Sequence, residues 1–595
     1  MIAGKVFTIA TAAFMLAGQP GWVKADASSD LHQLFAESWE RTLRENPTVA
    51  SSFGDLRYNR QWPDRSLGAI AVSHAEDRRD LARIRQIDRS ALSETDRINY
   101  DLFMRQTQDR VKAYRFRQFL LPLNQRGGIQ TADQLADRLK FDSARAYEDW
   151  IARLQSFDVY MDQTIKLMRR GIKEGRVHPT IIMQRLPAQI TAQLVDDPSA
   201  SSFFAPFNDM PESISEHRQG KLKARARKAI ARAVLPSFKR LAKFIDHDYL
   251  PVTRDQVGAD AQPDGEAFYQ FRVEHYTTTS LSADEIHEIG LREVARIRGK
   301  MMEIIKNLNF SGSFDDFLKF LRTDPQFYYD SSDELLAGYI AITKRIDPEV
   351  PRLFGRLPKA PYVVKAIPAA IAPDTTTAYY SRPAADGSRP GTYFVNLYRP
   401  EVRPKYEMEV LSVHEAVPGH HLQIALAQEL GELPAFRRYS GFTAFIEGWG
   451  LYSESLGGDL GLYADPYSEF GQLTYEMWRA VRLVVDTGMH AKHWSRQKAI
   501  TFFKDNAAKT EFDIVNEIDR YIVMPGQALA YKIGELKIKQ LRRQSQDALG
   551  EDFDIKRFHN AVLEKGAVPL DVLESQIDAW ITAEKNRFGR NSLKQ

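Results

Sequence analysis

A short segment in the last third of the chain gathers residue types that bind zinc. His414, His420 and His421 lie close together, Glu415 follows the first histidine, and Glu447 comes later in the chain. Two imidazoles and one carboxylate hold Zn²⁺ in many hydrolases and leave a fourth position for water. The segment therefore predicts a site for one Zn²⁺ ion with His414, His420 and Glu447 as ligands. Glu415 is the predicted general base, which accepts a proton from zinc-bound water.

The spacing of the histidines departs from the usual motif, in which the second histidine is four residues after the first. That position is Pro418 here. On an ideal helix His420 would lie about 600° round from His414, and His421 about 10 Å further along the axis. Proline removes an amide donor and disturbs the preceding turn, so we expect a distorted helix that rotates His420 into place. His421 stays the alternative ligand, because the sequence alone does not decide between them.

Two glutamates lie on the next predicted helical stretch. Glu447 falls within a helical pattern of aromatic residues and is the preferred third ligand. Glu454, two turns later, is expected to accept a hydrogen bond from a ligand imidazole rather than to bind the metal.

The elements that must position these residues are mostly helices. Residues 28–260 read as a helical N-terminal lobe after a signal peptide at residues 1–27, and residues 261–595 as the catalytic region. One segment, residues 358–400, has the β-branched and aromatic pattern of strands and lies directly before the histidines. Asn396 in this segment is a candidate for substrate binding. The expected fold is mainly α, multi-lobed and zincin-like, with a small mixed β-sheet next to the active-site helix.

Composition excludes several classes of function. A net charge of +3 over 595 residues gives no electrostatic basis for binding nucleic acid or an anionic membrane. The N-terminus has Lys5, an apolar run at residues 6–17 and small residues around Asp26, which is typical of a cleaved signal peptide. There is no cysteine, so neither disulfides nor a cysteine-linked lipid anchor can form. We expect a periplasmic protein without a membrane anchor, with free secretion as the alternative; the oligomeric state cannot be predicted.

At these motifs the chain resembles the bacterial family catalogued as domain of unknown function 885, in the zincin-like metallopeptidase clan. The resemblance rests on four blocks: His414-Glu415-x-x-Pro418-Gly419-His420-His421-x-Gln423, Glu447-Gly448-Trp449-x-Leu451-Tyr452-x-Glu454, Arg482-Leu483-Val484-Val485-Asp486-Thr487-Gly488-x-His490 and Arg520-Tyr521-x-x-x-Pro525-Gly526-Gln527-Ala528-x-x-Tyr531-Lys532-x-Gly534. It implies a gluzincin-type zinc peptidase with a mainly helical fold, and it gives no substrate.

The last two blocks supply further candidates. Amide hydrolysis passes through a tetrahedral oxyanion, which a hydroxyl or imidazole near the metal would stabilise; the candidates are Tyr531, preferred, and His490 and Tyr521. The cations Arg482, Arg520 and Lys532 are candidates for binding a substrate carboxylate. Arg482 and Asp486 are alternatively an ordinary ion pair one helical turn apart. Buried tyrosines with a bonded hydroxyl are the alternative for Tyr521 and Tyr531.

These observations together predict an exported zinc-dependent metallopeptidase that hydrolyses short or unfolded peptides, with access limited by the N-terminal lobe. Two alternatives remain open: a non-catalytic peptide-binding protein with a degenerate zincin fold, and a metal-dependent hydrolase of non-peptide amides. The presence of both Glu415 and Glu447 favours catalysis, since a binding protein needs no general base. The sequence does not distinguish endopeptidase from exopeptidase action.

Overall fold

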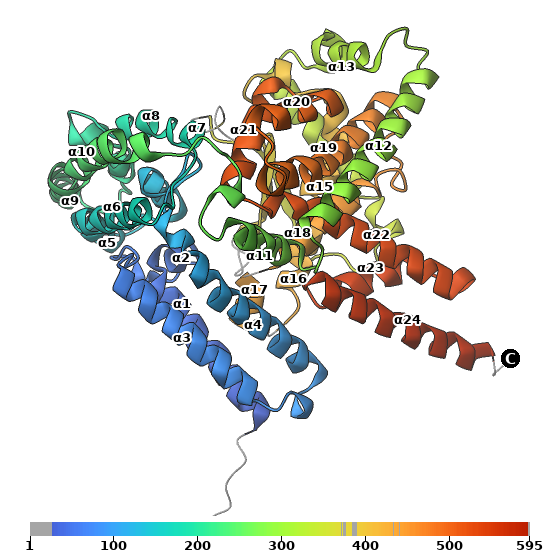
Figure 1. Cartoon of the computed structure of the whole chain (residues 1–595), viewed down its shortest axis with the longest axis horizontal. Coiled ribbons are helices and arrows are strands. Elements are labelled where there is room, and N and C mark those ends of the chain that lie inside the picture. Colours follow the sequence, from blue (N-terminus) through green and yellow to red (C-terminus); the bar gives the residue numbers. More distant parts are fainter. Residues whose placement is uncertain are drawn as a thin grey trace, which may run out of the picture.

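The computed structural model describes residues 26–592 except 370–371, 373–375, 384–388, 432 and 440. Apart from its last two positions, the expected signal peptide at residues 1–27 lies outside the described residues. The described chain is mainly helical with one small three-stranded sheet, which confirms the expected mix of elements (Figure 1). Among the described helices, none is both long and apolar enough to span a membrane.

The first helices pack against the C-terminal part of the chain. Side chains of Leu31, Leu34 and Phe35 repeat at helical spacing and are buried. The Phe35 ring lies 4.8 Å from that of Phe436, centroid to centroid, and both belong to the core that also contains the last helices. Four helices make up this part: α1 (Ala27–Glu45), α2 (Pro47–Ser52), α3 (Leu67–Gln86) and α4 (Glu94–Ala113).

A separate lobe follows, with its own core of aromatic side chains such as Trp150, Phe157 and Phe238. Buried side chains of residues 28–260 thus belong to more than one hydrophobic core. Figure 1 shows this second lobe to one side of the remaining helices. Its helices are α5 (Ala144–Gln155), α6 (Phe157–Lys173), α7 (Thr180–Met183), α8 (Leu186–Thr191), α9 (Glu216–Ala229) and α10 (Leu235–Phe244).

The sheet lies where the β-branched residues predict it. Its strand order is β1-β3-β2, with β1 parallel and β2 antiparallel to the central strand β3. Buried Tyr393 and Val395 of β3 pack in one cluster with Val410 and Leu411 of the following helix. The strands are β1 (Tyr362–Ala366), β2 (Ala378–Ser381) and β3 (Gly391–Val395), preceded by helices α11 (Gly265–Thr277), α12 (Ala283–Asn307), α13 (Phe314–Thr323) and α14 (Ser332–Ile346).

The remaining helices include those that carry the candidate site residues. A glycine contact brings two of them together: a Cβ on Gly448 would lie 2.5 Å from the Cα of Gly534, so only glycine permits this approach. Glu447 and Tyr531 are therefore carried on helices whose backbones touch. The helices are α15 (Met408–Glu415), α16 (His420–Gln428), α17 (Ala435–Tyr439), α18 (Thr443–Glu454), α19 (Pro466–Ala491), α20 (Arg496–Asn506), α21 (Glu511–Val523), α22 (Ala530–Leu549), α23 (Ile555–Leu563) and α24 (Leu570–Ser592).

Candidate metal centre

A break between two helices sets the position of the second histidine. The expected distorted helix is in fact two helices, because α15 ends at Glu415 and α16 begins at His420. The carbonyl of Pro418 in the break accepts hydrogen bonds from Trp449 Nε1 (2.9 Å) and from Ser453 Oγ (3.3 Å), both on α18. A Cβ on Gly419 would lie 2.0 Å from the His414 carbonyl oxygen, so the tight return of the chain requires glycine there.

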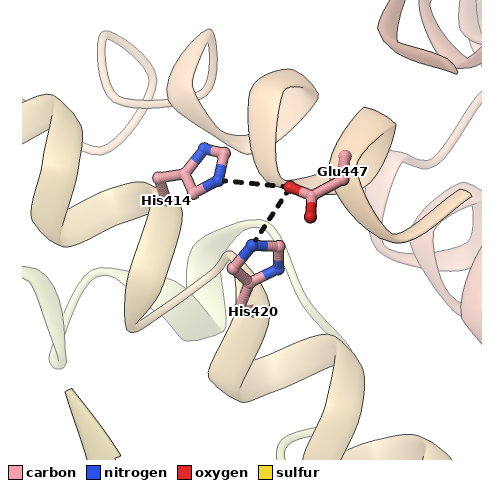
Figure 2. Close-up of side chains that lie close together, drawn as sticks. All are labelled: His414, His420 and Glu447. Atoms are coloured by element: carbon pink, nitrogen blue, oxygen red, sulfur yellow. Dashed lines mark ion pairs between the residues drawn. The ribbon is translucent and has the colours of Figure 1, made fainter. Parts of the chain in front are cut away.

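The break brings His414 and His420 to the same carboxylate. Nε2 of His414 lies 3.9 Å from Oε2 of Glu447, and Nε2 of His420 lies 3.5 Å from the same oxygen. The three potential ligand atoms lie within 4.8 Å of one another. Figure 2 shows both imidazoles turned toward Glu447, which comes from α18. Ligand atoms of a tetrahedral zinc site are about 3.4 Å apart, so a small contraction would fit these side chains to one ion.

His421 faces away from this group. Its Nδ1 hydrogen bonds to the hydroxyl of Tyr380 (2.9 Å) on β2, and its Nε2 to the carbonyl of Ala360 (3.1 Å). A Cβ on Gly391 would lie 2.7 Å from His421 Nδ1, so this glycine makes room for the ring. Both nitrogens of His421 thus bind the sheet region, and the structure brings His420 to His414 and Glu447 instead.

Glu454 contacts the nitrogen of His414 that points away from Glu447. Its Oε1 lies 2.8 Å from His414 Nδ1, and Glu454 is fully buried. Burial raises the pKa of the Glu454 carboxyl to about 8, while the positive charge of Arg479 opposes that rise. A proton on Nδ1 leaves the Nε2 lone pair directed at the metal position. Gly450 makes room for this imidazole, because a Cβ there would lie 2.8 Å from His414 Cε1.

Glu415 is not one of the three potential metal ligands, but the charges of His420 and Glu447 influence the pKa of its carboxyl. Burial raises the pKa of its carboxyl, and the negative charge of Glu447 adds to the rise. The positive charge of His420 and a hydrogen bond from the backbone amide of Tyr380 oppose the rise. A carboxylate with a raised pKa beside a metal position is suited to accept a proton.

Tyr531 is the oxyanion candidate that the structure brings to the site. It is half-buried in the first turn of α22, and the guanidinium carbon of Arg482 lies 4.3 Å from its ring centroid. Burial raises the pKa of its hydroxyl, and the negative charge of Glu447 contributes to the rise. Tyr531 therefore lies within electrostatic range of the carboxylate in the candidate metal site.

The other two oxyanion candidates are used internally. His490 Nδ1 accepts the backbone amide of Ala259 (2.9 Å), and its Nε2 donates to the carbonyl of Tyr521 (3.0 Å). The Tyr521 hydroxyl accepts from Arg482 Nε (2.8 Å) and donates to Glu517 Oε2 (2.7 Å). Both residues are completely buried. Contrary to the prediction, neither has a group left for a substrate oxyanion.

Two of the predicted substrate-binding residues are also structural. Lys532 Nζ is fully buried among three carboxylates, Glu293 (3.0 Å), Glu476 (2.8 Å) and Glu535 (2.6 Å). Asn396 is buried, and its amide nitrogen donates to the carbonyl of Ala372 (2.8 Å). Each side chain satisfies neighbouring groups of the fold, which corrects the prediction that they bind substrate.

Arg482 and Arg520 share Glu517 as a partner. Arg482 Nη2 lies 3.1 Å from Glu517 Oε2, and Arg520 Nη2 lies 2.9 Å from the same oxygen. The alternative pairing of Arg482 with Asp486 is wrong, because Asp486 accepts from the Tyr269 hydroxyl (2.6 Å) and from the Gly526 amide. Both arginines thus remain next to Tyr531 as candidates for binding an anion.

Arg479 is a site residue that the sequence analysis did not include. Its Nη2 lies 3.5 Å from Glu454 Oε1, and its charge also influences the pKa values of His414, Glu415 and Glu447. The signal that could have identified Arg479 is its place, with Arg482, on a helix whose other residues are almost all buried. Charged side chains are rarely buried without a partner.

Comparison with known proteins gives a family and a fold. The family described as "Bacterial protein of unknown function (DUF885)" matches residues 47–577. A protein from Colwellia psychrerythraea, provisionally described as a lipoprotein, is 28% identical; the match covers 94% of this chain and 100% of that one, with a TM-score of 0.87. A second, from Shewanella oneidensis, is 17% identical with a TM-score of 0.72 over 92% and 99% of the chains, which shows a shared fold only. A comparison with curated proteins finds no match.

Proposed function

The chain belongs to the bacterial family of unknown function DUF885, and from its site we propose that it is a zinc-dependent metallopeptidase of the gluzincin type. One observation carries the proposal: His414, His420 and Glu447 converge within 4.8 Å, from two helices separated by a break and from a third helix. Two nitrogens and one oxygen are a donor set that zinc accepts in hydrolases.

The groups around the three ligands supply the other parts of a hydrolytic site. When bound, a zinc ion would supply Lewis-acid chemistry and make water acidic enough to lose a proton near neutral pH. Glu415 would accept that proton, and its buried carboxyl has the raised pKa that this role favours. Tyr531 would donate a hydrogen bond to the oxyanion of the tetrahedral intermediate. Glu454 would hold His414 in the tautomer that binds through Nε2.

The sheet supports a peptide as the substrate. Strand β2 is at the edge of the sheet, because it pairs only with β3 among the described strands, and the hydroxyl of Tyr380 on β2 reaches His421 next to the site. An extended peptide can add to an edge strand through backbone hydrogen bonds, largely independently of its side chains. This arrangement favours unfolded or short peptides over intact folded proteins.

We also propose that the protein is exported, to the periplasm. The similar solved structure from Colwellia psychrerythraea is provisionally described as a lipoprotein, a class of exported protein. The signal peptide predicted at residues 1–27 would direct that export.

The variant Glu415→Gln tests the function directly. A mixed peptide library is incubated with the wild type, with Glu415→Gln and with the exposed-residue control Glu469→Gln, and zinc content is measured for each. We expect the wild type and the control to hydrolyse peptides and to lose activity to a chelator, because hydrolysis needs the metal. Glu415→Gln should keep its zinc and lose activity by at least about 10²-fold. Zinc-independent hydrolysis, or equal activity in all three proteins, would refute the proposal.

The same experiment separates the alternatives. A non-catalytic binding protein would retain peptides without cleaving them, and Glu415→Gln would change nothing. A hydrolase of non-peptide amides would leave the peptide library intact but cleave members of a panel of unrelated amides in a zinc-dependent way.

A further inference from the structure

Three arginines lie in the surroundings of Tyr531. Arg482 comes from α19, Arg520 from α21, and Arg126 from the turn at residues 124–127 of the preceding part of the chain. Glu517 makes ion pairs with two of them, at 3.1 Å to Arg482 and 2.9 Å to Arg520. The Tyr521 hydroxyl also donates to Glu517. One carboxylate thus neutralises part of a group with three positive charges.

Arg126 is held beside Arg520 by the contacts of its turn. The side-chain amide of Gln125 donates to the carbonyl of Asp519 (3.0 Å), the residue before Arg520. The carboxylate of Asp519 also pairs with Arg185 of the same lobe (2.8 Å). The backbone amide of Arg126 donates to Asn124 Oδ1 (2.9 Å), which fixes the turn itself. The position of Arg126 is therefore set by the fold, although its side chain is exposed.

The guanidinium of Arg126 has no hydrogen bond and no ion pair with any residue that the structure describes. Desolvation and the charge of Arg520 lower the pKa of Arg126, whereas Glu517 raises it. Arg482 Nη1, on a side chain that is only 4% exposed, likewise lacks a hydrogen-bond partner within the described chain. Unpaired buried donors and adjacent like charges both cost free energy, so an anion between these arginines would be stabilised.

Asp486 does not neutralise the positive charge of the three arginines. The positive charge of Arg520 lowers the pKa of the Asp486 carboxyl, which already accepts hydrogen bonds from the Tyr269 hydroxyl and the Gly526 amide. Burial raises the pKa of Asp486 to about 7, so it is only partly ionised near neutral pH. The positive excess in the group of arginines remains.

The arginines and the metal centre share Tyr531. The guanidinium carbon of Arg482 lies 4.3 Å from its ring centroid. The charges of Glu447, Arg482 and Arg520 influence the pKa of its hydroxyl. The charge of ionised Tyr531 in turn raises the pKa of Arg126. An anion bound by the arginines would thus lie next to a substrate whose scissile carbonyl is held at the metal.

From this arrangement we infer that Arg126, with the buried Arg482 and Arg520 behind it, binds the C-terminal carboxylate of the peptide substrate. The inference rests on the proposed peptidase function and deepens it: the enzyme is an exopeptidase that cleaves near the C-terminus. A carboxylate matches the planar guanidinium in a bidentate pair. Because Arg126 belongs to the other lobe, that lobe takes part in substrate selection.

Peptides that differ only at the C-terminus test the inference. A mixed pentapeptide library is made in two forms, one with a free C-terminal carboxylate and one with a C-terminal amide. Cleavage rates are measured for the wild type, for Arg126→Gln and for the matched control Arg145→Gln, whose side chain is 81% exposed. Binding of both forms to immobilised Glu415→Gln protein, with and without Arg126→Gln, is measured separately.

The wild type and the Arg145→Gln control should cleave the free acids about 10- to 100-fold faster than the amides, as expected for losing hydrogen bonds to a charged group. Arg126→Gln should bring that ratio close to one, mainly through KM, with unchanged zinc content and thermal midpoint. Equal cleavage of acids and amides by the wild type would overturn the inference while leaving the peptidase function intact.

The binding measurement covers the case in which neither form is cleaved. Arg126-dependent retention of the free acids alone would then keep the carboxylate site and refute the peptidase function. Equal retention of acids and amides would overturn the inference whether or not cleavage occurs.

Discussion

The contact between Glu454 and His414 gives a quantitative test of how the metal centre is supported. A bound divalent ion would favour the ionised form of the buried Glu454 carboxyl, so in the metal-bound protein Glu454→Gln keeps the shape of the side chain and removes a charge. The carboxylate is fully buried and lies 2.8 Å from His414 Nδ1. At an effective dielectric constant of about 20, a unit negative charge roughly 6 Å from a divalent ion contributes about 5 kcal/mol before any cost is subtracted.

Most of this attraction is offset in the protein. Burial of the charge costs free energy, and Arg479 Nη2 at 3.5 Å from the same oxygen already neutralises part of it. Loss of such a supporting partner typically weakens metal binding about 10- to 100-fold, which corresponds to about 1.4–2.7 kcal/mol. We expect Glu454→Gln to fall in this range.

The assay is competition for zinc between the protein and a chromophoric chelator of known affinity. The exposed carboxylate variant Glu469→Gln serves as the matched control and should bind zinc as the wild type does. If Glu454→Gln also binds zinc with wild-type affinity, then the contact at Nδ1 does not support a metal ligand and the reasoning fails.

Three further predictions concern the surroundings of the site. Gly450→Ala should lower zinc affinity at least about 10-fold, because its Cβ would lie 2.8 Å from the His414 ring. The control Gly458→Ala, at a position with open space around it, should bind zinc as the wild type does. Equal zinc affinities of the two variants would contradict this prediction. Tyr531→Phe should lower kcat by about 10²–10³-fold with unchanged zinc content; an unchanged kcat would exclude the oxyanion role. Burial raises the pKa of Asp486 from 3.8 to about 7, so the folded state holds its proton more tightly and stability falls as pH rises between these values. Asp486→Asn should flatten that fall in the thermal midpoint, and a parallel pH profile would show that another group causes it.

The sequence predicted those parts of the site that depend on local chemistry. His414, Glu415 and Glu447 follow from residue type and helical pattern, and the sheet follows from the β-branched residues near Thr392. The choice between His420 and His421 could not be made. It depends on how the chain returns after Pro418, and that path is fixed by hydrogen bonds from a helix distant in sequence.

The incorrect predictions have a common physical cause. His490, Tyr521 and Lys532 carry reactive groups next to recognisable motifs, but those groups satisfy buried partners elsewhere in the fold. A buried polar group needs a partner, and the residue type does not show whether that partner is a substrate or the protein itself. The sequence also does not show which core each helix of residues 28–260 faces, because amphipathic helices have the same pattern whichever core they face.

Zinc analysis of the purified wild type beside His420→Ala and His421→Ala tests the central claim most directly. The account predicts about one zinc per chain in the wild type and in His421→Ala, and a large loss in His420→Ala, with all three proteins folded by circular dichroism. Equal zinc content in the three proteins, or loss in His421→Ala alone, would contradict the assignment of His414, His420 and Glu447 as the metal ligands.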